Sequence, residues 1–544
     1  MRDPKEWIIA RTAALAGDAG QPAFAEYVVE PSAGLLTYSS LMSAEDCAVI
    51  DASAYEDART WFLEGGSDPT LSGGVSLGRS FELVATTTLV SHRRAAFVLR
   101  KIMERDGGSI FRLRGVGDEW RSAAVELGAR VVVDDAIAGP ATGPGIRVSR
   151  PSASERFLAM LVGRSGRERP RTVILDTPRW SLAYDRALLR SGGVCLVNPG
   201  ARVLLDTLLH ARSAQSSWLA DAATGPSGLV SVEDSPTAEL SSLRRGFEPL
   251  VPALGQWVEA GRRLGGKGVV AVATQDVSPP ARAFLLGFKA SGGLIITLEH
   301  GISGAYSTEV YSVADVLGAW GEPQAAYHRQ AGPPGLDVEA VGWPRLESVY
   351  SLRPAQTDAA WDLIFFAQPS VSLSSGDWPE DNLRALSAID TYAGAHRDRR
   401  VAIKLHPATG AYGAGVPPMG YAKTVSGDST SLVRSARIVA ISLSTTGIEA
   451  MAMGRPVIQM SRKGVLGAVE FISQSGAALA VGSGQELEAA VETLLTDPAA
   501  YDAVRGKGLD YAREFVRGVD SPGSAERRFV EIVQELGARR VEPK

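Results

Sequence analysis

The sequence has 544 residues, of which 45% are hydrophobic and 22% charged, an ordinary globular balance in a chain long enough for about three domains. Its formal net charge of -5 argues against a broad electrostatic surface for nucleic acid. The two cysteines, Cys47 and Cys195, are too few for a disulfide framework, so a reducing compartment is expected.

The start of the chain lacks the pattern of a secretory signal, because Asp3 and Glu6 are not followed by a long apolar region. No segment reaches about 18 uninterrupted apolar residues, the length that suggests a membrane-spanning helix. We therefore expect a cytoplasmic protein. Peripheral attachment to the inner face of the membrane is left open.

The first part of the chain, residues 1–150, has weak periodicity. The pattern predicts a helix over Ala95–Glu104 and a short buried strand at Val131–Val133. Ala138–Pro144 is rich in Gly, Pro and Ala and is typical of a linker. We interpret residues 1–150 as an N-terminal extension, which could also form part of the domain that follows.

Between residues 151 and 350, short apolar strands alternate with helices. The predicted strands are Thr172–Asp176, Val194–Val197, Val269–Thr274, Leu294–Leu298 and Asp315–Gly321. The predicted helices are Tyr184–Ser191, Ala238–Leu264 and Pro280–Ala290, and residues 213–235 are predicted to be a long loop. Such alternation indicates a parallel sheet with crossover helices.

The strand–helix pattern starts again after a predicted hinge near Pro344–Thr357. The predicted strands are Leu363–Phe366, Val401–Leu405, Ile438–Ser442 and Val457–Met460, and the predicted helices are Asp381–Gly394, Thr446–Met453, Glu486–Leu495, Tyr501–Phe515 and Ala525–Leu536. We expect an α/β protein with two Rossmann-like domains, residues 151–350 and 351–500. Terminal helices in residues 501–544 could pack back on the first of them.

The first candidate site follows the strand that ends at Leu298. Glu299, His300, Gly301 and Ser303 come at its carboxyl end, where ligands bind in open α/β sheets. Glycine lets a ligand approach the backbone closely, and histidine can take a proton near neutral pH. The alternative is a helix cap with a chance histidine.

The second candidate site is the run Lys404, Leu405, His406 and Pro407, again directly after a strand. Lys404 and His406 are two residues apart, so they share a face if the strand continues, and together they could hold a phosphate. Pro407 removes a backbone donor and ends the strand. The alternative is a buried structural histidine.

In the third candidate site, a strand runs into the hydroxyl-rich turn Ser444, Thr445 and Thr446, and then into a helix. Free amides at a helix N-terminus, with hydroxyls beside them, are suited to bind an anion. Glu449 lies about one turn into the helix, where its carboxylate could reach a ribose diol. Plain helix capping is the alternative.

Two supporting segments lie between the first and second candidate sites. One surrounds Trp320, and the other runs through Trp343 to Arg345. Both tryptophans could be ordinary packing residues. Arg345, at the hinge, could help to meet the charge of a phosphate.

The order of these motifs resembles that of bacterial surface-polysaccharide transferases, which include polysialyltransferases, capsule Kdo transferases and CDP-glycerol glycerophosphotransferases. The resemblance covers about residues 265–470. It lies in Leu298–Gly301, Trp320–Gly321 and Val341–Arg345, and in Lys404–Pro407 and Ser444–Thr446, which are similar to the group's "HP" and "SS/ST" donor motifs. Glu449–Ile458 is similar to the broader GT-B nucleotide-sugar signature.

This resemblance implies a GT-B fold, in which two Rossmann-like domains face a central cleft and the C-terminal one holds the donor nucleotide. His406 would contact the donor phosphate, with help from Ser444 and Thr445. His300 or Glu299 would be the acid or base. No metal or other cofactor is expected, and the sequence has no Asp-x-Asp motif and no closely spaced histidine ligands.

The resulting hypothesis is a metal-independent glycosyltransferase. Its donor would be a CMP-activated ulosonic acid of the sialic acid or Kdo type, and its acceptor a bacterial surface glycan, glycolipid or glycoprotein. Alternatives are a UDP-sugar, GDP-sugar or CDP-glycerol transferase, a non-hydrolysing UDP-sugar epimerase, and a non-catalytic binding protein with the same fold.

Overall fold

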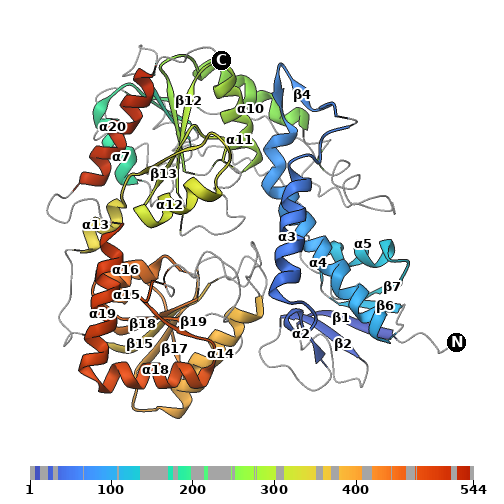
Figure 1. Ribbon diagram of the computed structural model, residues 1–544, viewed down its shortest axis with the longest axis vertical. Helices are drawn as coiled ribbons and strands as arrows, with labels where there is room; N and C mark the ends of the chain where they lie inside the picture. Colours follow the sequence, from blue (N-terminus) through green and yellow to red (C-terminus); the bar gives the residue numbers. More distant parts are fainter. Residues whose placement is uncertain are drawn as a thin grey trace, which may run out of the picture.

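The computed structural model describes residues 6–12, 22–27, 35–64, 66–106, 110–114, 116–134, 170–175, 182–197, 214–217, 247, 251–274, 276, 278–299, 301, 312–350, 359–368, 379–406, 419–442, 444–460, 472, 475–515 and 523–539. Three larger sheets, one after another along the chain, form three lobes (Figure 1). The fold is α/β, as the sequence predicts. None of the described helices has both the length and the apolar character needed to cross a membrane.

The N-terminal lobe contains a five-stranded parallel sheet in the order β3-β2-β1-β6-β7. Its strands are β1 (Glu6–Thr12), β2 (Ala23–Tyr27), β3 (Leu35–Leu36), β6 (Ile110–Arg114) and β7 (Arg130–Val133). Its helices are α2 (Tyr38–Leu41), α3 (Ala44–Ala58), α4 (Glu82–Asp106) and α5 (Asp118–Glu126). The predicted extension thus contains a sheet of its own. The predicted helix Ala95–Glu104 is the second half of α4.

Side-chain alternation along β6 shows how the N-terminal sheet is built. Phe111 and Leu113 are buried among the helices, while Arg112 and Arg114 point to the opposite face. There the two arginines form ion pairs with Asp134, and Arg112 also pairs with Glu6 of β1.

The middle lobe contains a seven-stranded parallel sheet in the order β10-β9-β8-β11-β12-β13-β14. Its strands are β8 (Thr172–Leu175), β9 (Val194–Val197), β10 (Ala214–Ser217), β11 (Val270–Ala273), β12 (Leu294–Leu298), β13 (Val316–Ala319) and β14 (Asp337–Ala340). The helices are α7 (Leu182–Ser191), α10 (Val251–Leu264), α11 (Pro279–Ala290) and α12 (Glu322–Ala331). Edge strand β10 falls inside the predicted loop 213–235, and the rest of that loop lies outside the described residues.

The C-terminal lobe contains a six-stranded parallel sheet in the order β17-β16-β15-β18-β19-β20. Its strands are β15 (Trp361–Phe366), β16 (Val401–Lys404), β17 (Lys423–Val425), β18 (Ala436–Ile441), β19 (Val457–Met460) and β20 (Leu479–Val481). Its helices are α14 (Pro379–Ala395), α15 (Ser429–Arg434), α16 (Thr446–Ala452), α18 (Gly484–Thr496) and α19 (Pro498–Arg513). Apolar clusters fill both faces of the sheet.

Two helices join the middle and C-terminal lobes. Helix α13 (Pro344–Tyr350) follows β14 at the predicted hinge, with Pro344 at its first position, where a missing N–H costs nothing. Helix α20 (Ser524–Ala538) returns from the C-terminal lobe and packs on the middle sheet (Figure 1). There the rings of Phe529 and of Tyr184 in α7 contact each other, with centroids 4.8 Å apart. Two Rossmann-like domains joined in this way form the GT-B architecture that the motifs predict.

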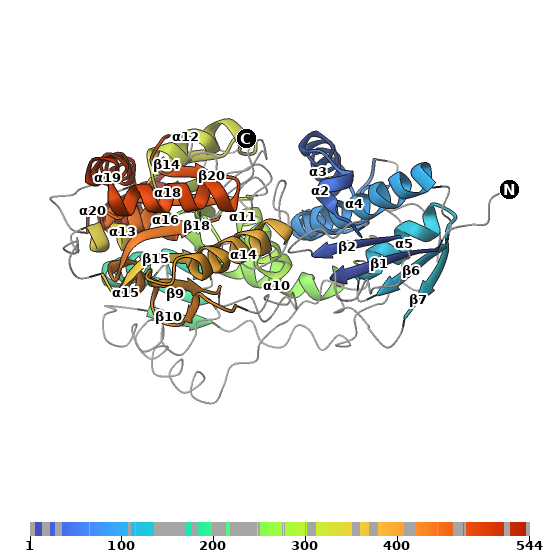
Figure 2. The ribbon, with the colours of Figure 1, turned by 90° about the horizontal axis from the view of Figure 1, so that it is seen from below.

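The N-terminal lobe contacts both other lobes. Glu82, at the start of α4, forms a buried ion pair with Arg282 of α11 in the middle lobe. Phe81 stacks on Phe247 with ring centroids 4.8 Å apart. On the other side, β2 lies against α14 of the C-terminal lobe (Figures 1 and 2).

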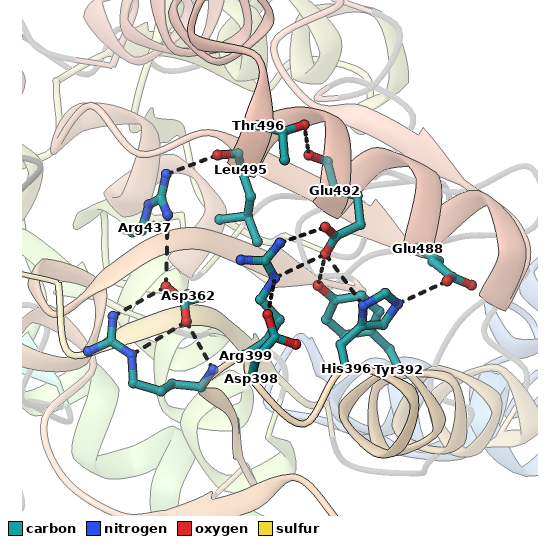
Figure 3. Close-up of polar contacts among 11 residues, drawn as sticks. Asp362, Tyr392, His396, Asp398, Arg399, Arg437, Glu488, Glu492, Leu495 and Thr496 are labelled. Carbon is teal, nitrogen blue, oxygen red and sulfur yellow. Dashed lines mark hydrogen bonds and ion pairs between the residues drawn. The ribbon is translucent and has the colours of Figure 1, made fainter.

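A polar network lies at the amino-terminal ends of β15 and β18 (Figure 3). The carboxyl ends of the strands, which carry the candidate site residues, are at the opposite end of the sheet. Glu492 of α18 accepts hydrogen bonds from Tyr392 at 2.6 Å and Arg399 at 2.7 Å. Burial opposes ionisation of Asp362, but hydrogen bonds from Arg400 hold its pKa below the ordinary value. The Tyr392–Glu492 hydrogen bond thus joins α14 to α18 at this end of the sheet.

Candidate functional site

The hydroxyl-rich turn between β18 and α16 is where the sequence predicts nucleotide binding. Ser444, Thr445 and Thr446 are each half-buried. Gly447 lets α16 begin close to the sheet, since a Cβ at this position would lie 2.5 Å from Ile441 Cδ1. A larger residue here would have to displace the end of the Ile441 side chain.

The amides at the start of α16 differ from the prediction of a free anion site. Thr446 N–H donates to Ser444 Oγ at 3.3 Å, Gly447 N–H to the Ser444 carbonyl at 3.0 Å, and Ile448 N–H to the Thr445 carbonyl at 3.0 Å. The turn therefore caps its own helix, as the alternative interpretation held. The Thr445 hydroxyl makes no capping hydrogen bond. In the described part of this turn, the amides of Thr446, Gly447 and Ile448 are thus used within the turn, and the Thr445 hydroxyl is a group that the cap does not use.

The first and third candidate motifs meet across the two Rossmann-like domains. A Cβ placed on Gly301 would lie 3.8 Å from Thr445 Cγ2, an ordinary van der Waals distance. Gly301 follows β12 of the middle sheet, and Thr445 follows β18 of the C-terminal sheet. The carboxyl ends of these strands thus face each other. His300 and Ser303 lie outside the described residues.

Glu299 does not fit the predicted role of catalytic acid or base. Its side chain is fully buried, and one carboxylate oxygen accepts the Trp320 backbone N–H at 2.8 Å. The other oxygen lies 3.2 Å from Nε2 of His328, which is also fully buried. Two buried partners occupy this carboxylate, so it acts inside the domain. Sequence reasoning missed His328, because nothing in its local pattern on α12 points to Glu299.

Glu449 and Arg345 are brought together, but as partners of each other. Arg345 Nε lies 3.0 Å from Oε1 of Glu449, and Arg345 Nη2 donates to Oε2 at 3.1 Å. Nη2 also lies 3.3 Å from the hydroxyl of Thr430, a residue that the sequence analysis did not single out. Burial raises the pKa of the Glu449 carboxyl, and the Arg345 charge opposes this shift. Contact between Glu449 and a ribose would require the pair to open.

Lys404 and His406 are half-buried at the carboxyl end of β16. Burial lowers the pKa of His406, and the nearby Lys404 charge lowers it further, so the ring is neutral near pH 7. The strand register places Phe366 of β15 level with both Lys404 and Ile441. Two strand spacings, about 10 Å, therefore separate Lys404 from the end of β18. Pro407 lies outside the described residues.

Trp320 and Trp343 are packing residues, as the alternative interpretation held. Their rings stack with centroids 4.2 Å apart and an interplanar angle of 11°. Both are buried in the apolar cluster that contains Ile448 and Met451 of α16. The stack therefore packs the end of the middle sheet against α16, the helix that carries Glu449.

No protein-family model matches this sequence, and no curated protein sequence matches it significantly. Among solved structures, the chain is similar to UDP-GlcNAc 2-epimerase from Neisseria meningitidis bound to UDP-GlcNAc, with 12% identity, a TM-score of 0.40, and coverage of 67% of this chain and 99% of the other. It is similar to a glycosyltransferase from Rickettsia africae, with 12% identity, a TM-score of 0.38, and coverage of 69% and 100%. It is also similar to Arabidopsis thaliana UGT89C1 complexed with quercetin, with 14% identity, a TM-score of 0.42, and coverage of 68% and 100%. Likenesses this distant say nothing about the reaction.

Proposed function

We propose that this protein is an enzyme that acts on a nucleotide-activated sugar, with the nucleotide held by the C-terminal lobe. The approach of Gly301 to Thr445 is the observation that carries the proposal, because it brings together loops from the carboxyl ends of two parallel sheets. Ligands bind at such ends in α/β folds. Lys404 and His406 lie at the same edge as the Thr445 turn.

We propose glycosyl transfer as the reaction. The acceptor oxygen would attack the anomeric carbon, the bond from that carbon to the phosphate oxygen would break, and the nucleotide would leave with the bonding electrons. His300 is the proposed base that takes the acceptor proton. Lys404 and His406 would meet the charge on the leaving phosphate, and the hydroxyls of Ser444, Thr445 and Thr446 would bind its oxygens.

For the donor we propose a CMP-activated ulosonic acid, and for the acceptor a bacterial surface glycan, glycolipid or glycoprotein. Both follow from the order of the chain's motifs, which resembles that of bacterial surface-polysaccharide transferases. The scheme calls for no metal ion, because Lys404, together with a His406 ring whose pKa a bound phosphate would raise, would meet the phosphate charge.

A thermal-shift screen with CMP, CDP, UDP and GDP tests the nucleotide proposal, since a ligand that binds the native state raises the melting temperature. We expect CMP to give the largest shift. Failure of all four nucleotides to shift the transition would refute the proposal.

Product analysis then tests the reaction. A transferase consumes the activated sugar only when an acceptor is present, apart from slow hydrolysis. An epimerase converts a UDP-sugar without acceptor, and a binding protein converts nothing.

Thr445→Val keeps the shape of the side chain and removes the hydroxyl, so it should weaken nucleotide binding by roughly 5- to 10-fold.

A further inference from the structure

The guanidinium of Arg345 is held rigidly on one side only. A guanidinium carries five N–H donors in a planar fork. Nε and Nη2 of Arg345 contact Glu449, and Nη2 also contacts Thr430. Within the part of the chain that the structure describes, Nη1 has no hydrogen bond, and 37% of the side chain is exposed. Arg345 is therefore a fixed cation with an open edge.

The carboxylate of Glu449, in contrast, is already occupied. Its side chain is only 6% exposed; Oε2 accepts a hydrogen bond from Nη2 of Arg345, and Oε1 lies 3.0 Å from Nε in the same ion pair. Hydrogen bonds between arginine and a carboxylate are among the strong ones in proteins. A ribose diol would have to replace this charge-assisted hydrogen bond and the ion pair with neutral hydrogen bonds and leave the arginine without its carboxylate. The geometry thus favours a positioning role for Glu449.

Both partners lie beside the proposed nucleotide site. Arg345 is the second residue of α13, which follows the carboxyl end of β14 in the middle sheet. Glu449 lies in α16, and its backbone N–H is 3.4 Å from the Thr445 carbonyl. Thr446 and Glu449 are three residues apart, about 4.5 Å along a helix axis. The anchored guanidinium is therefore close to the hydroxyls of the turn.

We propose that Arg345 binds the phosphate of the nucleotide donor through its open edge, and that Glu449 positions Arg345 instead of binding the ribose. The inference rests on the proposed function, because it takes a nucleotide as the ligand. Arg345 belongs to the hinge helix and Glu449 to the C-terminal lobe. Phosphate binding would therefore engage the hinge directly.

Calorimetric titration with matched ligands tests the inference. CMP and cytidine, or UDP and uridine, share base and ribose and differ in phosphate. Arg345→Gln should weaken nucleotide binding by roughly 10- to 100-fold and leave nucleoside binding unchanged. Glu449→Gln should show the same selective loss, and the double variant should lose no more than Arg345→Gln alone. Arg329→Gln, which removes an exposed arginine on α12, is the control for net charge.

The outcomes separate the two proposals. Nucleotide binding by the unaltered protein and by Arg345→Gln with equal affinity would overturn this inference alone. Equal weakening of nucleotide and nucleoside by Glu449→Gln would also overturn it, because Glu449 would then bind the ribose. Absence of nucleotide binding by the unaltered protein would overturn the proposed function, and the inference with it. If Arg345→Gln does not fold, Arg345→Lys keeps the charge, loses the fork, and should show a smaller loss of the same selectivity.

Discussion

Substitution of Glu299 distinguishes a catalytic carboxylate from a structural one. The structure places this side chain at 0% exposure between the Trp320 N–H and His328. Glu299→Ala would remove the acceptor of the buried Trp320 N–H and the partner of the buried His328 ring. Leaving a buried polar group unsatisfied costs about 1–3 kcal/mol, so two such groups should cost about 2–6 kcal/mol. For a domain of about 200 residues, this loss corresponds to a fall in melting temperature of roughly 4–24 °C.

Glu299→Gln keeps the volume of the side chain and one acceptor, so it should cost only about 1–2 kcal/mol. Glu322→Gln is the matched control, since Glu322 lies on the same helix as His328 but forms an exposed pair with Arg329. That change should cost less than about 1 kcal/mol.

Differential scanning fluorimetry, together with nucleotide titration and turnover, measures these effects. We expect Glu299→Gln to keep most of the activity after a small loss of stability. A Glu299→Gln protein with unchanged melting temperature and turnover reduced at least 100-fold would refute the reasoning, because that is the behaviour of a general base.

Three further predictions concern other parts of the structure. Burial and the Lys404 charge hold the pKa of His406 below its ordinary value of 6.5. A bound phosphate would raise this pKa, because it favours the protonated ring. The nucleotide affinity of the unaltered protein, relative to that of His406→Gln, should therefore increase as the pH falls from about 8 to about 6. A ratio of dissociation constants that does not change with pH would exclude this role for His406. Gly301→Ala should bind nucleotide with an affinity within about twofold of that of the unaltered protein, because its Cβ would meet Thr445 at 3.8 Å, an ordinary contact. Gly301→Leu should bind nucleotide and turn over substrate poorly. Equal activity of the two variants would show that the space beside Thr445 is not used. Asp390 accepts the backbone N–H groups of Gly420, Tyr421 and Ala422, and although burial opposes ionisation, these bonds hold its pKa below 3.8. The contribution of this carboxylate to the free energy of unfolding is therefore present above pH 3.8 and lost as the pH falls through the pKa of Asp390 in the folded protein. In urea unfolding, Asp390→Ala should therefore be about 1 kcal/mol less stable than the unaltered protein at pH 7, and this difference should shrink near pH 3. An equal deficit at both pH values would contradict this assignment.

The central strands of the two large sheets were predictable because they are buried on both faces. Central parallel strands have near-continuous apolar runs, such as Val194–Val197 and Leu294–Leu298. Strands β10, β17 and β20 were missed. The residues of β10, Ala214–Ser217, have no apolar run and become a strand through backbone pairing with β9. Of the N-terminal sheet only β7 was predicted, at Val131–Val133, and the other strands were missed for a related reason. Arg112 of β6 is accommodated by Glu6 and Asp134, which are distant in the sequence.

The sequence by itself determined where chemistry could occur, because polar residues that follow an apolar strand lie at the carboxyl edge of a sheet. This local rule located Lys404 and His406 and the turn at Thr445. Only the tertiary structure decided which groups are already taken. Glu299 meets His328 and Glu449 meets Arg345 across 29 and 104 residues of chain. Local patterns predict on which element a carboxylate lies. Its partner depends on how elements far apart in the sequence pack together, and that partner decides whether the carboxylate is open to a ligand.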